Sequence, residues 1–143
     1  QGRQLQQADH QPVAFTEQDG GGLDAHTQVV IPVGTRGRRL FFLGNVHGWS
    51  SHDQGTGEWG AVAEYVIHYA DGQTQTVPLI TGRTVDEWTG KPRAAEAFPG
   101  AEAKYWHLNV VGAKLRSAKV ERIVFRDLGT PAAPVLAAVT LER

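Results

Sequence analysis

The stretch YVIHYADGQTQTVPLI, residues 65–80, decides the fold of this chain. Over residues 63–70, Tyr65, Ile67 and Tyr69 alternate with residues of the opposite face, as expected for a strand with one buried side. Asp71 and Gly72 follow as a two-residue turn, in which Gly takes the positive φ that such a turn requires. Residues 75–80 are then expected to form the second strand, which runs back along the first. The stretch predicts an antiparallel hairpin with both Tyr side chains in the core or at its margin.

Short apolar or alternating runs, separated by turn residues, recur on both sides of this hairpin. No window shows apolar residues at helical spacing for more than about one turn, which disfavours helical bundles and doubly wound sheets. The chain therefore predicts an all-β fold, a sandwich or barrel. Residues 82–100 are expected to be irregular, with at most one helical turn at 93–98. The further strands are expected at residues 13–15, 27–33, 39–43, 105–111, 120–127 and 134–141.

Two of these runs carry specific expectations about burial. Residues 40–43 read Leu-Phe-Phe-Leu and are apolar at every position, which is typical of a central strand covered on both faces. In residues 105–111, Trp106 shares one face with Leu108 and Val110, whereas Tyr105 shares the other with residues 107 and 109. We expect Trp106 in the core and Tyr105 on the exposed face.

Composition restricts the class of protein. The chain has 143 residues, the size of one ordinary domain, and its 14 Lys and Arg against 15 Asp and Glu give a formal net charge of −1. Nucleic acids and anionic membrane surfaces require a basic excess, so neither is expected as a partner. The absence of Cys excludes disulfides and thiolate metal sites. Residues 1–11 are polar and predict a disordered linker, followed by one β-sandwich module at 12–143.

The hairpin and its continuation carry a family resemblance. The hairpin segment YVIHYADG, residues 65–72, and the return VPLITGRTVDEW, residues 77–88, resemble the galactose-binding-domain-like jelly rolls attached to bacterial sugar-processing enzymes. The resemblance covers residues 40–141, although Thr89 stands where the family often has a second Trp. It implies a single jelly-roll β-sandwich that is non-catalytic, often binds carbohydrate and accompanies a catalytic domain. It also implies a secreted or periplasmic location.

The polar stretch at residues 44–60 is the first candidate sugar site. We expect it to be a long loop outside the core, and loops of this length tend to be functional. Trp49 and Trp59 supply aromatic faces for stacking on a sugar ring, and the polar side chains between them supply hydrogen bonds to hydroxyls. Alternatively, one or both Trp side chains fold back as a lid over the end of the sheet. The polar candidates in this loop are His47, His52 and Asp53.

The second candidate site follows the return strand. Trp88 can stack on a sugar, while Arg83 and Asp86 can each make paired hydrogen bonds to neighbouring hydroxyls. The competing interpretation is structural, with an ion pair between Arg83 and Asp86 that fixes the loop. Together, the two sites predict a carbohydrate-binding accessory module. The alternative is a structural or protein-interaction β-sandwich domain of a larger enzyme.

Catalytic and metal-binding patterns are weak. Ser50, Ser51 and the six His residues lack the Gly-x-Ser-x-Gly turn of hydrolases, and the spacing of His47, His52 and Asp53 matches no defensible metal motif. Asp19 and Asp24 lie in a Gly-rich loop of a kind that can hold a structural calcium ion. Calcium takes about six to eight oxygen ligands, so two carboxylates are too few to assign the site. We expect no catalytic residue and no cofactor.

Overall fold

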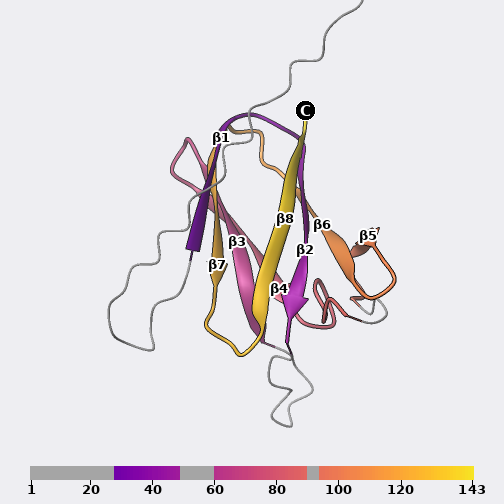
Figure 1. Cartoon of the computed structure of the whole chain (residues 1–143). Helices are drawn as coiled ribbons and strands as arrows, with labels where there is room; N and C mark the ends of the chain where they lie inside the picture. Colours follow the sequence, from indigo (N-terminus) through magenta and orange to yellow (C-terminus); the bar gives the residue numbers. More distant parts are fainter. Residues whose placement is uncertain (1–27, 49–59, 90–93) are drawn as a thin grey trace, which may run out of the picture.

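The computed structural model describes residues 28–48, 60–89 and 94–143. They form two four-stranded antiparallel sheets that pack face to face as a β-sandwich, with the orders β1-β7-β3-β4 and β5-β6-β2-β8 (Figure 1). The all-β prediction is confirmed. The strands are β1 (Gln28–Thr35), β2 (Arg39–His47), β3 (Ala61–Tyr69), β4 (Thr74–Ile80), β5 (Phe98–Glu102), β6 (His107–Lys114), β7 (Val120–Asp127) and β8 (Ala133–Glu142).

The core lies between the two sheets. Phe42 of β2 stacks on Tyr65 of β3, with ring centroids 3.9 Å apart and planes 6° from parallel. Leu40, Ile67 and Tyr69 are buried around this pair, so the two sheets are held together chiefly by the removal of apolar surface from water. Burial raises the pKa of the Tyr65 hydroxyl, because a phenolate is poorly solvated in the core.

The predicted hairpin is confirmed with Asp71 and Gly72 at its tip, but its turn is longer than the two residues expected, because residues 70–73 separate β3 from β4. β3 pairs with β4 in antiparallel register, and Tyr65 and Tyr69 are both buried as expected. Gly72 has a φ of 82°, a conformation that favours glycine, and its amide donates to the Tyr69 carbonyl at 3.0 Å. The Tyr69 amide donates to the Gln73 carbonyl at 2.9 Å and closes the turn.

The expected loop at residues 44–60 begins later than predicted. β2 continues to His47, and Gly44, Asn45 and Val46 are buried strand residues that pair with β8. Gly44 permits this continuation because a Cβ there would collide with the Val135 carbonyl oxygen. The prediction that this whole stretch lies outside the core is therefore wrong for its first residues.

The apolar run at residues 40–43 is the start of an interior strand, between β6 and β8. Leu40 and Phe42 are 1% exposed, whereas Phe41 and Leu43 are only half-buried on the outer face of the sheet. The position of the strand agrees with the prediction, but its two faces are not equally covered.

The predicted orientation of β6 is wrong. His107 and Asn109 are each 3% exposed and lie on the buried face with Val111, whereas Trp106 precedes the strand and is 37% exposed. Alternation in the sequence alone predicts that the face with Leu108 and Val110 is buried, because that face is the more apolar one. The polar face is inside because His107 Nε2 and Asn109 Nδ2 bond to a buried carboxylate, as described below. Tyr105 is 70% exposed, as expected.

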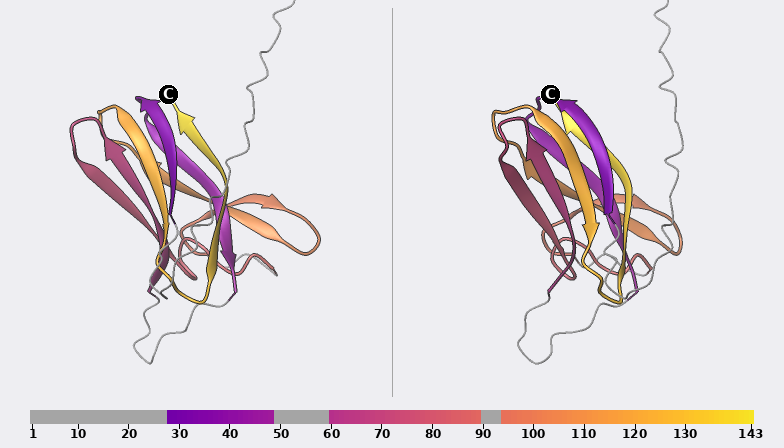
Figure 2. Two further views of the ribbon diagram at one scale, coloured as in Figure 1. Left: turned by 60° about the vertical axis from the view of Figure 1, so that its left-hand side comes forward. Right: turned by 90° about the vertical axis from the view of Figure 1, so that its left-hand side faces the viewer.

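The two ends of the sandwich differ. At the lower end in Figure 1, β2 ends, β6 and β8 begin, and the connection from β4 to β5 crosses between the sheets. At the upper end lie the β1–β2 turn, the β3–β4 hairpin tip and the end of β8. Figure 2 shows the two layers from the side, with the β5–β6 hairpin projecting beyond them. The predicted linker at 1–11, the strand at 13–15 and the calcium candidates Asp19 and Asp24 lie outside the described residues.

Candidate functional site

A short segment, residues 85–89, is inserted at the lower end between β2 and β6. We call it the rim segment. Beyond the pairing of Gly44 with Asn109, β2 and β6 no longer pair, and the rim segment takes the place between them. The Val46 amide donates to the Asp86 carbonyl at 3.3 Å, and the Trp88 amide donates to the Val46 carbonyl at 2.9 Å. On the other side, the His107 amide donates to the Trp88 carbonyl at 2.8 Å.

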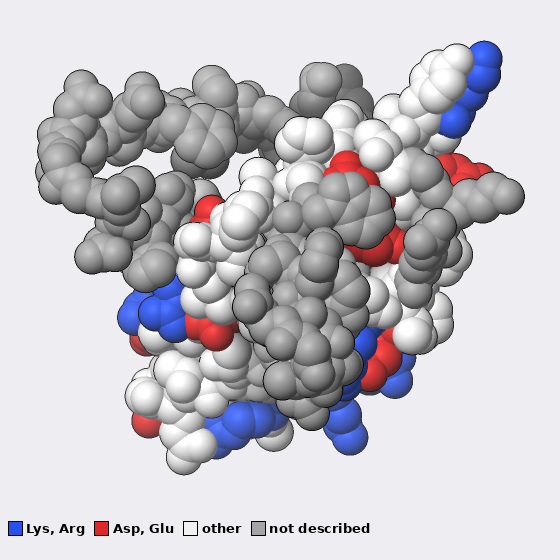
Figure 3. Space-filling model, turned by 90° about the horizontal axis from the view of Figure 1, so that it is seen from below, with Lys and Arg blue, Asp and Glu red and all other residues white. Residues whose placement is uncertain are grey.

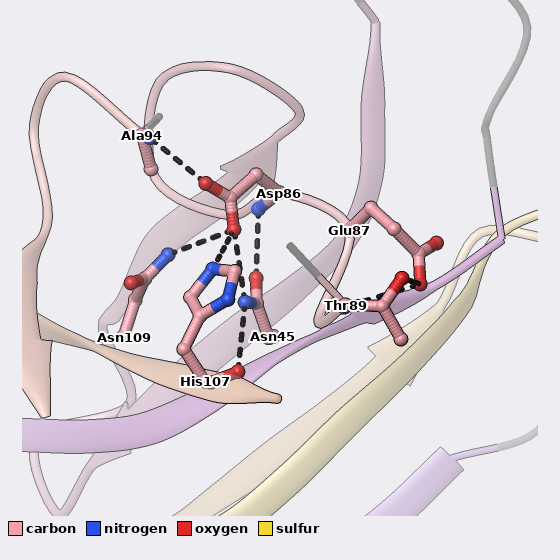
Figure 4. Close-up of polar contacts among 7 residues, drawn as sticks. All are labelled: Asn45, Asp86, Glu87, Thr89, Ala94, His107 and Asn109. Carbon is pink, nitrogen blue, oxygen red and sulfur yellow. Dashed lines mark hydrogen bonds and ion pairs between the residues drawn. The ribbon is translucent and has the colours of Figure 1, made fainter. Parts of the chain in front are cut away.

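The Asp86 carboxylate anchors the rim segment in a polar cluster (Figure 4). Its side chain is 9% exposed, and its Oδ1 accepts from His107 Nε2 at 2.7 Å and from two Asn side chains. These donors are Asn45 Nδ2 at 2.9 Å and Asn109 Nδ2 at 3.2 Å. Oδ2 accepts from the Ala94 amide at 3.1 Å. A buried carboxylate requires this number of donors, so the cluster fixes where the β4–β5 connection lies.

Asn45 completes the cluster from β2. Its Oδ1 accepts from the Asp86 amide at 2.7 Å, and its Nδ2 also donates to the His107 carbonyl at 3.3 Å. The Asn45 side chain thereby bonds to the backbone of both the rim segment and β6, as a neighbouring strand in a sheet would. The other ring nitrogen of His107, Nδ1, is buried with no hydrogen-bond partner among the described residues.

Next to the buried cluster, Trp88, His47 and Glu87 form a second group at the surface. Trp88 Nε1 donates to His47 Nδ1 at 2.7 Å, and the two rings meet edge to face with centroids 5.8 Å apart. Glu87 Oε1 lies 3.6 Å from the same His47 nitrogen, and Glu87 Oε2 accepts from the Gly48 amide at 2.5 Å. Trp88 is half-buried, whereas the His47 side chain is 66% exposed. The indole ring is therefore held in one orientation at the surface.

Tyr105 and Trp106 immediately precede His107 in the chain. The His107 amide bonds to the Trp88 carbonyl and so links them to this group. Both are exposed, and the Lys104 ammonium lies 5.0 Å from the centre of the Tyr105 ring. Figure 3 views the molecule from the lower end. Among the described side chains in this view, Asp and Glu lie both toward the middle and at the edge of the face, and Lys and Arg lie mainly toward the edge.

No family model, curated protein or solved structure matches this chain.

The structure brings together three of the predicted site residues. His47, Asp86 and Trp88 all lie at the lower end, although the Asp86 carboxylate points into the buried cluster and not toward solvent. Arg83 lies apart from them. Its guanidinium pairs with Glu96 Oε1 at 2.7 Å, so the expected ion pair between Arg83 and Asp86 is not formed. The remaining predicted residues, Trp49, His52, Asp53 and Trp59, lie outside the described residues.

Sequence reasoning missed the roles of Asn45, His107 and Asn109. Asn45 was assigned to a loop and the other two to an outer face. A usable signal was present, since His107 and Asn109 share a strand face with Val111, and polar residues on such a face predict a polar partner inside the fold. The partner itself could not be read from local sequence.

The described part of the chain holds no group of three or more His, Asp or Glu side chains that could bind a metal ion. No helix in it has the length and apolar character needed to cross a membrane.

Proposed function

We propose that this protein is a non-catalytic carbohydrate-binding module, with a galactose-binding-domain-like jelly-roll fold, that binds sugar at its lower rim. The observation that carries the proposal is the 2.7 Å hydrogen bond from Trp88 Nε1 to His47 Nδ1. It holds a partly exposed indole ring in one orientation without using the ring face. A preoriented aromatic face suits the apolar C–H face of a sugar, because little side-chain entropy is lost on binding.

Polar groups for the sugar hydroxyls surround the ring. With its Nδ1 accepting from Trp88, His47 carries a proton on Nε2 and can donate it to a hydroxyl. Thr89 Oγ1, which donates to Glu87 Oε1 at 3.2 Å, keeps acceptor capacity for a ligand. Asp86 acts here as a positioning residue, because its buried carboxylate sets the place of the rim segment. Trp49, Trp59, His52, Asp53 and Arg83 stay predictions as further ligand contacts.

The engagement of both rim carboxylates favours binding over hydrolysis. Asp86 accepts at least four hydrogen bonds within the protein, and Glu87 is bonded to the Gly48 amide and to Thr89. Adjacent residues in an extended segment also point apart and do not flank one glycosidic bond. The proposal includes a neighbouring catalytic domain as a partner and a secreted or periplasmic location, both from the family resemblance.

The test is a glycan-array screen of the full chain, followed by affinity measurements with the best glycan on two variants. Trp88→Ala should weaken binding by about 1–3 kcal/mol, the typical loss for an aromatic anchor. Phe98→Ala removes another aromatic ring, on the β5 edge strand and 68% exposed, and should leave the affinity unchanged. An array without any bound glycan, or a Trp88 variant that binds as well as the wild type, contradicts the proposal.

The alternative, a protein-interaction domain, has one observation in its favour. Phe98, Trp106 and Val135 are large apolar residues with 68%, 37% and 42% exposure in the sheet that contains β5, β6, β2 and β8, or directly beside it. Exposed apolar residues of this kind are common at protein interfaces. If Phe98→Ala and Val135→Ser abolish association with an adjoining catalytic domain while no glycan binds, the alternative is correct.

A further inference from the structure

The upper end of the sandwich contains a cavity that the proposed sugar site does not use. It has a volume of about 380 Å³, at the small end of the range for ligand pockets. The β1–β2 turn, the first residue of β2, the end of β6 and the end of β8 surround it. We call it the basic cavity. Its polar lining consists of Arg38, Arg39, Lys114, Arg116, Ser117 and Glu142.

Basic side chains outnumber acidic ones in this lining by four to one, although the chain as a whole carries a net charge of −1. Arg39 lies directly opposite Lys114 in the pairing of β2 with β6. Like charges in directly opposed strand positions repel each other. Glu142, on the other neighbouring strand, offsets part of this repulsion, since its Oε2 lies 3.9 Å from Arg39 Nε. Among the described residues, neither Arg38 nor Lys114 forms an ion pair.

One cation of the cavity is held in place by the fold. Arg116 donates two hydrogen bonds to the Asp71 carboxylate, at 2.9 and 3.3 Å, and its guanidinium lies 5.0 Å from the centre of the Tyr69 ring. Its amide also donates to the Tyr69 hydroxyl at 3.2 Å. Arg116 is thus neutralised by Asp71 and oriented. Arg38, Arg39 and Lys114 supply the other three positive charges, of which Glu142, the only carboxylate among the described lining residues, offsets one.

We propose that the basic cavity binds a tetrahedral oxyanion, a phosphate or sulfate group, either as the free ion or as an ester on a small molecule. The forked guanidinium groups of Arg38 and Arg39 match the oxygen geometry of such a group, and Lys114 adds a point charge. The Ser117 hydroxyl can donate a further hydrogen bond. A bound anion also relieves the repulsion between Arg39 and Lys114. The proposal is independent of sugar binding at the opposite end of the sandwich.

The experiment measures binding by calorimetry and amide chemical shifts in a low-salt buffer without multivalent anions. The probes are inorganic phosphate, inorganic sulfate and glucose 6-phosphate, with a DNA duplex as a test for an extended polyanion. We expect at least one small anion to bind and to shift the amides of residues 114–117. Tighter binding of glucose 6-phosphate would assign the cavity to an ester, and tighter binding of an inorganic ion would assign it to the free ion.

Three variants that each remove one positive charge make the test specific. Arg38→Gln and Lys114→Gln should each lower the affinity about tenfold, whereas Lys104→Gln, at the β5–β6 connection, should leave it unchanged. The Lys114 variant should melt no lower than the wild type without ligand, because the substitution removes a like-charge pair. The proposal is overturned if no small anion binds, if the Lys104 variant loses as much affinity as the other two, or if only the duplex binds.

Discussion

Replacing Asp86 by Ala tests whether the buried carboxylate anchors the lower end of the sandwich. The substitution removes the acceptor of at least four hydrogen bonds, among them three from the side chains of Asn45, His107 and Asn109 and one from the Ala94 amide. The three side chains belong to residues that are no more than 3% exposed, so their donors cannot simply turn toward bulk water. We expect a large loss of stability and a displaced rim segment.

The size of the loss follows from the burial of the donors. A buried donor left without its acceptor is destabilising by about 1–3 kcal/mol, and such losses do not add fully because water enters the space. Loss of a whole buried hydrogen-bond network is among the few changes that destabilise a protein by more than the usual ~0.5–3 kcal/mol, and we take about 3–5 kcal/mol as the range for Asp86→Ala. For a chain of this length, that corresponds to a melting temperature lowered by roughly 10–20 °C.

The assay is thermal unfolding followed by circular dichroism, with Asp71→Ala as the matched control. Asp71 is also bonded to a basic group, Arg116, but this ion pair lies at the surface and its side chains are 42% and 39% exposed. Removal of an exposed partner leaves the other group in water, so the control should melt close to the wild type. If Asp86→Ala melts within about 3 °C of the wild type, or no lower than the control, the anchoring role is refuted.

Two further predictions concern backbone packing and an ion pair. Gly44→Ala should lower the free energy of unfolding in urea by about 1–3 kcal/mol, because the added Cβ meets the Val135 carbonyl oxygen. Gly60→Ala places its Cβ in open space and should be neutral. Equal urea midpoints for the two variants would contradict this prediction. Arg116 and the Gln73 amide lower the pKa of Asp71 below its usual 3.8. The ion pair between Asp71 and Arg116 therefore stabilises the fold above that pH, and its contribution is lost as the pH falls through the lowered pKa. Carboxyl NMR titration should show this, and Arg116→Gln should raise the pKa of Asp71 toward 3.8; an unchanged value would exclude the ion pair in solution.

The hairpin of β3 and β4 could be predicted because its signals are local. The alternation of Tyr65, Ile67 and Tyr69 and the Asp-Gly turn lie within a few residues of each other, and no distant partner is needed to interpret them. The same holds for the all-β class, which follows from the spacing of apolar residues along the whole chain.

The polar cluster could not be predicted in this way. Asn45, His107 and Asn109 are 41, 21 and 23 residues from Asp86 in the sequence, and only the completed fold brings them together. Without knowledge of the carboxylate, the more apolar face of the strand predicted at residues 105–111 is the one with Trp106, Leu108 and Val110. Hydrophobicity therefore favours the wrong face, and the buried hydrogen bonds decide the orientation of the strand.

The position of Trp88 was only partly predictable. A Trp after the return strand, next to two carboxylates, is visible in the sequence, and so is the choice between stacking and a structural role. The hydrogen bond to His47 depends on the insertion of the rim segment beside the end of β2. That insertion in turn depends on β2 continuing through Gly44, which the sequence analysis treated as the start of a loop.

The most direct test of sugar binding at the rim is an NMR titration that observes the indole N–H signal of Trp88, assigned by its loss in Trp88→Ala. The titrant is the glycan with the strongest array signal. We predict a saturable shift of this signal, because a sugar stacked on the ring changes the environment of an N–H group already bonded to His47. If the glycan binds and the Trp88 signal does not move, or if no glycan binds at all, the central claim of rim binding is contradicted.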